Sequence, residues 1–376
     1  MVPVIYHPAY QDYNFGPEHP FTPARLEMIL ELLEALSDPF NPVTPPLATR
    51  ADLLTVHEED FIDQVVAAGA DQPLPRARHF GLDTPDVPAF EGMDKAARAL
   101  VGGTLHGARL LTEGQATKVL QFGGGFHHAR ERFASGFCIY NDLSVAIRHL
   151  TAHGFRVAYL EIDVNHGDGV QWIHYAEENV LTISLHESGS YLFPGTGGIH
   201  ELGRGAGHGF KLNVPLEPYT MDAGYLEVFE RVVPHALSWY RPDVLVVQCG
   251  ADAHYQDPLA HLLLTTHAYQ TLFHRIVALA NRYAGGRALF TLGGGYDLDA
   301  TTRIWTMLYL LLQGRPLPER LPEAWRSRWE KRLGRPLTPT LLDDPPDFNI
   351  QGRADIEAQN RSISRRLLEM AAPLWY

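Results

Sequence analysis

Three short apolar runs constrain the fold of this chain most strongly. They span residues 180–185, 243–249 and 287–292, and none of them alternates between polar and apolar side chains. A strand without that alternation is buried on both faces. Further strands are predicted at residues 2–6, 117–122 and 155–160. Helical patterns separate the runs, which predicts an α/β fold with a mostly parallel central sheet and helices on both faces.

Polar residues gather just beyond the ends of these predicted strands. His127 and His128 leave a glycine-rich turn, the segment 161–168 closes another strand, and Asp252 and Tyr296 follow two more. Open α/β sheets place their functional sites at the carboxyl ends of the strands. We therefore expect these four stretches to meet in one site.

The segment Glu161-Ile-Asp-Val-Asn-His-Gly-Asp168 carries the densest chemistry. An unpaired buried carboxylate is very costly, so acids at this place are expected to be ligands or charge partners. Asp163 and Asn165 point to the same side if the strand continues. His166 is predicted to be a structural residue of the core.

Composition excludes several kinds of partner. The net charge of -13 argues against direct binding of nucleic acid, which needs clustered lysine and arginine. We find neither an apolar run long enough to span a membrane nor the basic, apolar start of a secretion signal. Cys138 and Cys249, the two cysteines, are predicted to be reduced thiols of a cytoplasmic protein. These patterns leave the oligomeric state open.

A helix is predicted to start with Thr22 as N-cap and Pro23 in its first turn. Its apolar face is expected at Leu26, Ile29, Leu30, Leu33 and Leu36. Arg25 lies in the first turn, where the helix dipole disfavours a cation. A solvated arginine and an arginine that reaches into a site are equally compatible with this position.

Two segments are irregular in sequence. Residues 71–93 are rich in proline, glycine and aspartate and are predicted to form a loop. The region from about residue 314 is interrupted by prolines, with Trp325 and Trp329 on a predicted helix whose other face is solvated. No repeat or domain boundary is visible. We therefore predict one domain over residues 1–376, with a helical and proline-rich C-terminal extension.

Several motifs together resemble the zinc-dependent histone deacetylase superfamily. They are Gly-Phe-His-His-Ala at 125–129, Ala-Ser-Gly-Phe-Cys at 134–138, Asp-Val-Asn-His-Gly-Asp-Gly at 163–169, Phe-Pro-Gly-Thr-Gly at 193–197, Gln-Cys-Gly-Ala-Asp at 248–252 and Gly-Gly-Gly-Tyr at 293–296. His-Glu-Ser-Gly at 186–189 and the segment 252–259 look most like its bacterial acetoin-utilisation deacetylases. The resemblance runs from about residue 5 to 305 and implies a three-layer arginase/deacetylase fold.

The resemblance also implies a metal centre. The ligands of the family fall on Asp163, Asn165 and Asp252, which would hold one divalent ion. Zn²⁺ is the first candidate, with Fe²⁺, Mn²⁺ and Co²⁺ as others. Three protein ligands leave room for a water molecule and a substrate carbonyl.

Roles for the neighbouring side chains follow from the same resemblance. It pairs His127 with Glu161 and His128 with Asp168, where each carboxylate orients an imidazole. His128 would act as the general base, with His127 as electrostatic support. Tyr296 would donate a hydrogen bond to the oxyanion of the tetrahedral intermediate.

More peripheral positions are implied as well. The family's substrate tunnel falls on Gly136, Phe137, Phe193 and Leu259. Arg25 matches an arginine of an inner cavity beyond the metal. Ser184 and Leu185 match positions that help to hold a monovalent cation such as K⁺.

Two residues depart from the family pattern. Glu161 replaces a shorter aspartate, and Asn165 replaces a histidine ligand. An amide oxygen is a poorer zinc donor than imidazole, and oxygen-rich sites favour harder ions such as Mn²⁺ or Mg²⁺. Asn165 is compatible with a weakened or different metal site, with a degenerate enzyme, or with an altered chain.

Three functions are considered. The first is a metal-dependent amidohydrolase that removes acetyl or similar acyl groups from protein lysines. The second is a catalytically impaired homologue that binds acyl-lysine or an acylamine because of Asn165. The third is an acetylpolyamine deacetylase, since a negative protein does not repel a polycation. A ureohydrolase ranks low because Asp252-Ala-His254 lacks the second acid of a two-metal site.

Overall fold

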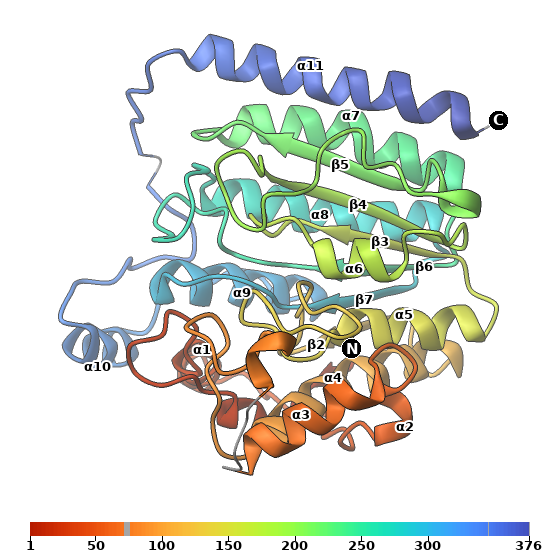
Figure 1. The fold of residues 1–376 in the computed structure, drawn as a ribbon. Helices are drawn as coiled ribbons and strands as arrows, with labels where there is room; N and C mark the ends of the chain where they lie inside the picture. Colours follow the sequence, from red (N-terminus) through yellow and green to blue (C-terminus); the bar gives the residue numbers. More distant parts are fainter. Residues whose placement is uncertain (71–75, 345, 376) are drawn as a thin grey trace.

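A seven-stranded sheet forms the centre of the molecule, in the order β1-β2-β7-β6-β3-β4-β5 (Figure 1). All neighbouring strands are parallel. The strands are β1 (Val4–Ile5), β2 (Lys118–Gln121), β3 (Val157–Glu161), β4 (Val180–Glu187), β5 (Lys211–Leu216), β6 (Val244–Gln248) and β7 (Ala288–Thr291). The structure is a computed structural model that describes residues 1–70, 76–344 and 346–375. Residues 71–75 of the predicted loop lie outside this range; within the rest of it, Ala77–Phe80 forms a 3₁₀ turn.

The strands lack alternation because both faces of the sheet are covered. In β3, Ala158 and Leu160 contribute to the core on one face, whereas Val157 and Tyr159 contribute to the core on the other. All five residues of β3 are buried. The predicted doubly covered parallel sheet is therefore confirmed.

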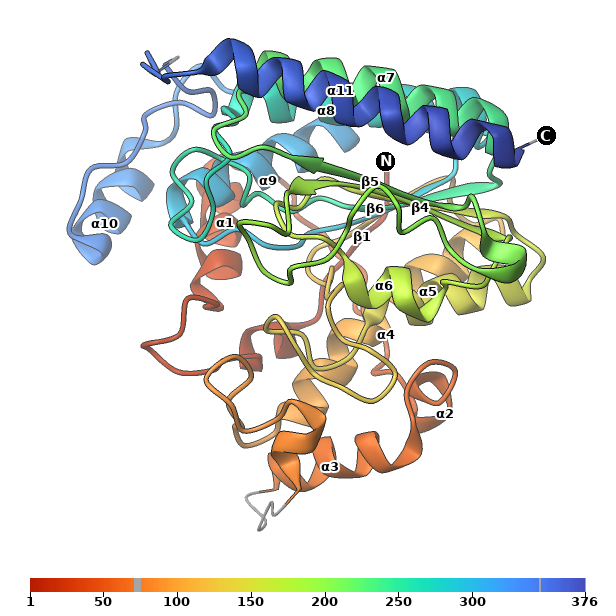
Figure 2. The same ribbon diagram turned by 45° about the horizontal axis from the view of Figure 1, so that its top comes forward.

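Helices form a layer on each side of the sheet (Figure 2). One layer consists of α1 (Ala24–Ala35), α7 (Asp222–Tyr240), α8 (Thr266–Tyr283), α9 (Leu298–Leu312) and α11 (Arg353–Ala371). The other layer consists of α4 (Met93–Thr112), α5 (Asp142–Ala152) and α6 (Asp168–Ile173). The short α2 (Arg50–Leu53) and α3 (Glu59–Gly69) extend the second layer, and α10 (Glu323–Leu333) packs on α1.

The C-terminal region is part of this architecture. Trp325 and Trp329 are each 1% exposed, and their indoles donate to the Met28 carbonyl and the Glu31 carboxylate of α1. Helix α11 packs on α7 and on β5 at the edge of the sheet. The predicted packing of the tryptophan pair is confirmed, and the extension also covers a sheet edge.

Three local predictions need correction. Helix α1 begins at Ala24, one residue later than predicted, with Pro23 in the N-cap position. Its buried residues are Arg25, Met28, Ile29, Leu32 and Leu33, so the apolar face is rotated from the predicted one. Strand β5 was not predicted, because Lys211 and Asn213 interrupt its apolar pattern.

Both cysteines are buried free thiols. None of the helices in the described part of the chain has the length and apolar content of a membrane-spanning segment.

Candidate active site

The four polar stretches converge, as predicted, at the carboxyl ends of four adjacent strands. Strands β2, β7, β6 and β3 are consecutive in the sheet, and each leads directly into one stretch. The strand register brings Glu161 level with Gln248, and Gln248 level with Thr291. Segments that lie far apart in the sequence therefore contribute side chains to one place.

Asp163 and Asp252 form an acidic pair at the centre of this site. Asp163 is 1% exposed, and its Oδ2 accepts hydrogen bonds from Gln248 Nε2 at 2.6 Å and from the Gly294 amide at 2.9 Å. Asp252 is fully buried, and its Oδ1 accepts from the Val164 amide at 2.8 Å. Its Oδ2 has no hydrogen-bond partner among the described residues.

Burial and the neighbouring Asp163 raise the pKa of Asp252 well above its ordinary value. Two facing buried carboxylates with one unsatisfied oxygen are the arrangement that a bound cation stabilises. The carboxylates of Asp163 and Asp252 are therefore suited to bind a metal ion.

Glycines allow the backbone to approach these carboxylates closely. A Cβ atom on Gly294 would lie 1.8 Å from Asp252 Oδ2 and 2.9 Å from Asp163 Oδ2. A Cβ atom on Gly250 would lie 2.3 Å from Asp163 Oδ2. Any larger residue at either position would displace the acidic pair.

Asn165, the third predicted ligand, lies beside this pair and is half-buried. Its amide nitrogen Nδ2 donates to the Phe193 carbonyl at 2.8 Å, and its backbone N–H donates to Asp163 Oδ1 at 3.0 Å. Only Oδ1 of the side chain is left for a metal ion. Within the described ranges, no three His, Cys, Asp or Glu side chains gather as a metal site. The candidate donor set is therefore two carboxylates and one amide oxygen.

Two histidine–carboxylate pairs stand next to the acidic pair. His127 Nδ1 lies 3.1 Å from Glu161 Oε2, and His128 Nδ1 lies 2.7 Å from Asp168 Oδ1. The two imidazole rings are 4.0 Å apart, and each histidine is 4% exposed. Since both Nδ1 atoms face carboxylates, the two Nε2 atoms are the ones available to the site. The predicted pairing is present in the structure.

The two histidines differ in electrostatics. Burial disfavours the cation of His127, but Asp163 and Glu161 outweigh it and raise its pKa to about 9. Burial and the neighbouring His127 lower the pKa of His128, against the opposing effect of Asp168. The first ring is thus suited to carry a positive charge and the second to accept a proton.

Glu161 fits behind His127 despite its extra methylene group. Its carboxylate also accepts hydrogen bonds from the Tyr159 hydroxyl and the Gly167 amide. A Cβ atom on Gly167 would lie 2.0 Å from Glu161 Oε2. Burial opposes ionisation of Glu161, yet His127, with smaller contributions from His166 and Ser184, lowers its pKa to about 2.

Sequence reasoning missed the residues that shape the histidine loop. Asp142, at the start of α5, accepts hydrogen bonds from the backbone amides of Gly125 and Phe126 at 3.0 and 2.8 Å. Asn141 donates to the Ala129 carbonyl at 2.8 Å, on the other side of the two histidines. The dipeptide holds both ends of the loop. Two consecutive polar residues at a buried helix start were the available signal.

A pocket of about 300 Å³ opens beside the histidines. Its lining includes Gly136, Phe137 and Tyr296, and the rings of Phe137 and Tyr296 are 5.6 Å apart. Phe193 is 47% exposed and does not line the pocket itself, although its ring lies 4.9 Å from that of His128, which does. Leu259 is 40% exposed and does not line the pocket.

Tyr296 is oriented through its backbone, whose N–H donates to Asp257 Oδ2 at 2.8 Å. Burial, Asp252 and Asp163 raise the pKa of the Tyr296 phenol well above its ordinary value. The phenol therefore stays protonated and can donate a hydrogen bond.

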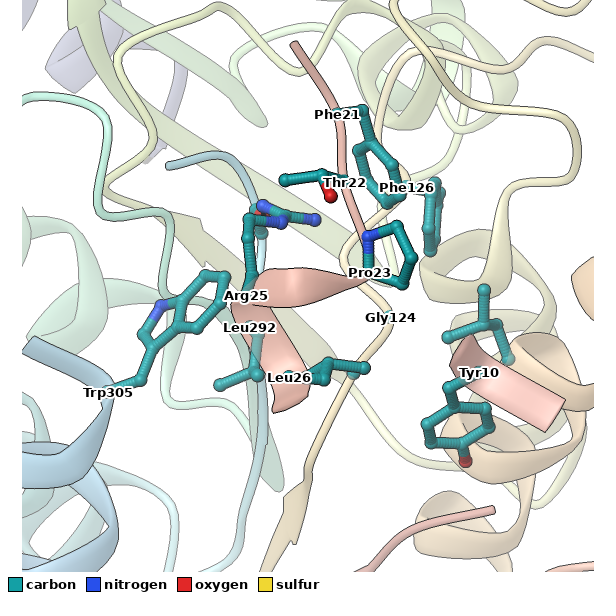
Figure 3. Close-up of a pocket in the computed structure, with 13 residues that line it drawn as sticks. Tyr10, Phe21, Thr22, Pro23, Arg25, Leu26, Gly124, Phe126, Leu292 and Trp305 are labelled. Carbon is teal, nitrogen blue, oxygen red and sulfur yellow. Dashed lines mark hydrogen bonds between the residues drawn. The ribbon is translucent and has the colours of Figure 1, made fainter. Parts of the chain in front are cut away.

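Arg25 points inward. It is 7% exposed, and its Nη1 donates to the carbonyls of Gly293 and Gly295 at 2.9 and 3.2 Å. Figure 3 shows it beside a second pocket, together with Phe21 and Trp305. Arg25 is therefore not a solvated surface arginine, and its role in an inner cavity stays a prediction.

The predicted monovalent-cation residues lie on β4. Ser184 Oγ is 2.7 Å from His186 Nδ1, and the buried Leu185 accepts a long hydrogen bond from Tyr225 at 3.4 Å. K⁺ binding at Ser184 and Leu185 stays a prediction. His166 is 1% exposed, as predicted for a core residue, and its Nδ1 contacts Thr196 Oγ1 at 2.8 Å.

The three-layer fold with acids at its strand ends places the protein in the arginase/deacetylase class of α/β proteins. Within that class the chain belongs to the histone deacetylase family, because its residues 19–312 match the Histone deacetylase domain.

Curated relatives cover nearly the whole chain. The acetoin utilization protein AcuC of Bacillus subtilis (strain 168) is 41% identical over 371 residues, which are 96% of each chain. The protein of the same name from Staphylococcus aureus (strain MSSA476) is 36% identical over 99% of this chain and 96% of its own.

Solved structures agree with the assignment. An HDAC homolog complexed with SAHA superposes with a TM-score of 0.85 at 27% identity, over 96% of this chain and 99% of its own. The HDAC homolog from Aquifex aeolicus gives a TM-score of 0.83 with the same identity and coverage. Both share the fold of this chain.

Proposed function

We propose that the protein is a metal-dependent amidohydrolase that removes acetyl or similar acyl groups from lysine side chains of proteins. The observation that carries this proposal is the position of the two histidine–carboxylate pairs against the acidic pair. His127 Nε2 lies 3.7 Å from Asp163 Oδ1, so the free edge of this imidazole faces a candidate metal ligand, and the His128 ring lies beside it. Membership of the histone deacetylase family supports the same reaction.

Asp163, Asp252 and Asn165 Oδ1 are the atoms proposed to hold one divalent ion. When bound, the ion supplies Lewis acidity toward an amide carbonyl. Zn²⁺ is expected from the family, with Fe²⁺ or Co²⁺ as alternatives, whereas three oxygen donors favour a harder ion such as Mn²⁺. Metal preference is therefore a property to measure in this chain.

The protein's own groups move the protons. Neutral His128 accepts a proton from the attacking water at Nε2, while Asp168 holds its Nδ1–H and stabilises the imidazolium. Nε2 of His128 then donates this proton to the leaving amine. His127, held by Glu161, gives electrostatic support to the site, and the Tyr296 hydroxyl donates to the oxyanion, a contact worth about 3 kcal/mol.

Reconstitution tests this function. The purified protein is loaded separately with Zn²⁺, Fe²⁺, Co²⁺ or Mn²⁺ and assayed with an acetyl-lysine peptide. We expect hydrolysis with at least one ion, and its loss in a His128→Ala variant that binds the same amount of metal. Absence of turnover with every ion, in a folded protein, would refute the proposal. Acetylated polyamines in the same assay test the substrate alternative.

A second candidate function is a binding protein without turnover. The observation that favours it is the side-chain amide of Asn165. Its Nδ2 donates to the Phe193 carbonyl, so only its oxygen, a weak metal ligand, is left for a metal ion. This alternative predicts SAHA or acyl-lysine binding without hydrolysis. It also predicts that Asn165→His raises both zinc content and rate. If Asn165→His changes neither of them, the amide is not the cause of inactivity.

A further inference from the structure

A buried charge network joins the C-terminal region to the active-site edge of the sheet. Its centre is Asp343, which is 5% exposed and lies beyond residue 312, where the family match ends. Its partners belong to α8, to α9 and to the segment 252–257, which carries Asp252 and Asp257.

The Asp343 carboxylate accepts three hydrogen bonds. Oδ1 accepts from Arg303 Nη1 of α9 at 2.7 Å, and Oδ2 accepts from the Thr266 amide of α8 at 2.8 Å. Oδ2 also accepts from His254 Nε2 at 2.9 Å. The backbone of Asp343 is fixed as well, because its N–H donates to Thr266 Oγ1 at 2.7 Å.

The hydrogen bond to His254 has a defined direction. The Gln256 amide donates to His254 Nδ1 at 3.2 Å, so Nε2 carries the proton that Asp343 accepts. Arg303 Nη2 also reaches the Gln256 side-chain oxygen at 3.2 Å. The network thus forms hydrogen bonds with two residues of the segment 252–257, His254 and Gln256.

This segment connects directly to the proposed chemistry. Asp252 lies two residues before His254, and Asp257 follows Gln256 and accepts the Tyr296 amide hydrogen at 2.8 Å. A displacement at His254 would therefore reach one proposed ligand along the chain. A displacement at Gln256 would reach the proposed oxyanion donor through Asp257.

We propose that Asp343 is a positioning residue of the active site, which fixes the segment 252–257 through His254 and Arg303. The inference rests on the proposed function for its consequence in catalysis. Groups behind the direct ligands orient them, and their loss typically costs about 10- to 100-fold in metal affinity or activity. The C-terminal extension is then part of the active-site architecture.

The variant Asp343→Asn tests this role, because its amide nitrogen would oppose the His254 or Thr266 donor. Asp222→Asn is a matched control. Asp222 accepts from the Thr265 amide at 2.8 Å and from the Thr265 hydroxyl at 2.6 Å, at the same end of α8. None of its hydrogen bonds described here reaches the segment 252–257. Both variants lose a carboxylate that accepts hydrogen bonds from the start of α8, and only Asp343 also hydrogen-bonds the segment 252–257 directly.

Three measurements are made on the full chain: hydrogen exchange of the amides in 252–257, Zn²⁺ or Mn²⁺ titration, and kcat and KM for an acetyl-lysine peptide. For Asp343→Asn we expect faster exchange in this segment, and metal affinity or kcat lower by about tenfold with a smaller change in KM. Asp222→Asn should leave all three near wild type. Equal effects of both variants, or wild-type exchange in Asp343→Asn, would overturn the inference.

Failure of the proposed function is distinguishable from failure of this inference. If the wild-type protein neither binds metal nor hydrolyses substrate, the exchange comparison still decides whether Asp343 positions the segment. If Asp343→Asn does not fold, His254→Leu removes the same link, and His254→Gln keeps a donor at that place. His254→Leu should then reproduce the faster exchange and His254→Gln should not; the same exchange in both would overturn the inference.

Discussion

At the scale of single residues, the site depends on compensations between neighbours. Glu161 is longer than the aspartate of the family pattern, and Gly167 leaves the space that its carboxylate occupies. Asp252 and Asp163 are matched in the same way by Gly294. At these positions, the size of each acidic side chain therefore depends on the glycine that leaves space for it.

The pair of Glu161 and Gly167 gives a first prediction. Gly167→Ala should lower the free energy of unfolding by about 1–3 kcal/mol, because the new methyl group overlaps a carboxylate fixed by three donors. In a Glu161→Asp background the shorter side chain should relieve this overlap. Urea unfolding of the wild type, the two single variants and the double variant gives the coupling energy between the two positions, expected near 1 kcal/mol. A coupling energy of zero would show that the two side chains do not compete for this space.

Asp168 gives a second prediction, which concerns pH. Burial disfavours its charge, but His128 and Arg130 outweigh that effect and lower its pKa to about 2. A carboxylate with a lowered folded-state pKa stabilises the protein above its ordinary pKa of about 4, and this stability is lost as pH falls toward the lower value. Asp168→Asn should therefore cost about 2 kcal/mol at neutral pH and much less near pH 2.

Urea unfolding at several pH values checks this difference. The control is Asp60→Asn, which removes an exposed ion pair with Arg132. Exposed pairs contribute little to stability, so this variant should differ from the wild type by a small and nearly pH-independent amount. A pH-independent cost of Asp168→Asn would contradict the assigned pKa.

At the scale of elements, six of the seven strands in the sheet coincide with predicted strands, and the exception is β5. Lys211 on this strand is buried, and its ammonium donates to three backbone carbonyls, of Glu177, Val180 and Phe210. Asn213 donates to Gln171 of helix α6. Because most of these partners are distant in the chain, they leave no local pattern in the sequence. The sequence of a buried polar strand therefore resembles that of a loop.

The same reason explains which site residues could be predicted. Four strand-end motifs were visible because each is compact in sequence. Asp142 and Asp343 act through hydrogen bonds to other segments of the chain, such as that between His254 and Asp343, which are 89 residues apart. Arg25 stayed undecided for the same reason, since its acceptors lie in the loop after β7.

The C-terminal cover of β5 gives a third prediction, at this scale. The indole of Trp375 stacks on Trp239 at 4.4 Å and donates to the Gly209 carbonyl at 2.9 Å. Trp375→Ala should cost about 3–5 kcal/mol of stability, because it empties a buried site. Leu374→Ala, next to it and 39% exposed, should cost much less. Urea unfolding of both variants checks this; similar losses would show that the end of the chain does not pack as described.

At the scale of the whole molecule, one sheet carries the entire site, and the extension is attached to the helices of one layer and to the edge strand β5. Helix α10 contacts α1, Asp343 contacts α8 and α9, and α11 covers β5. The prediction of a single domain over residues 1–376 was made without these contacts, because contacts between distant segments cannot be derived from local patterns.

The predicted single domain gives a fourth prediction. Thermal unfolding of the full chain should show one cooperative calorimetric transition, with equal calorimetric and van't Hoff enthalpies. Limited proteolysis should not release a folded fragment that ends near residue 312. A separate low-temperature transition assigned to residues 314–376 would contradict this organisation.

The order of the strands has a consequence for synthesis on the ribosome. Strand β2 pairs with β1 on one side, but its pairing with β7 on the other side waits for that strand, which ends at Thr291. Nascent chains emerge from the amino end and cannot form such distant pairings early. Asp163 would thus emerge long before Asp252, and Asp343 later still. A truncated chain would expose unpaired acids and strand edges, and only the finished polypeptide would present a complete site.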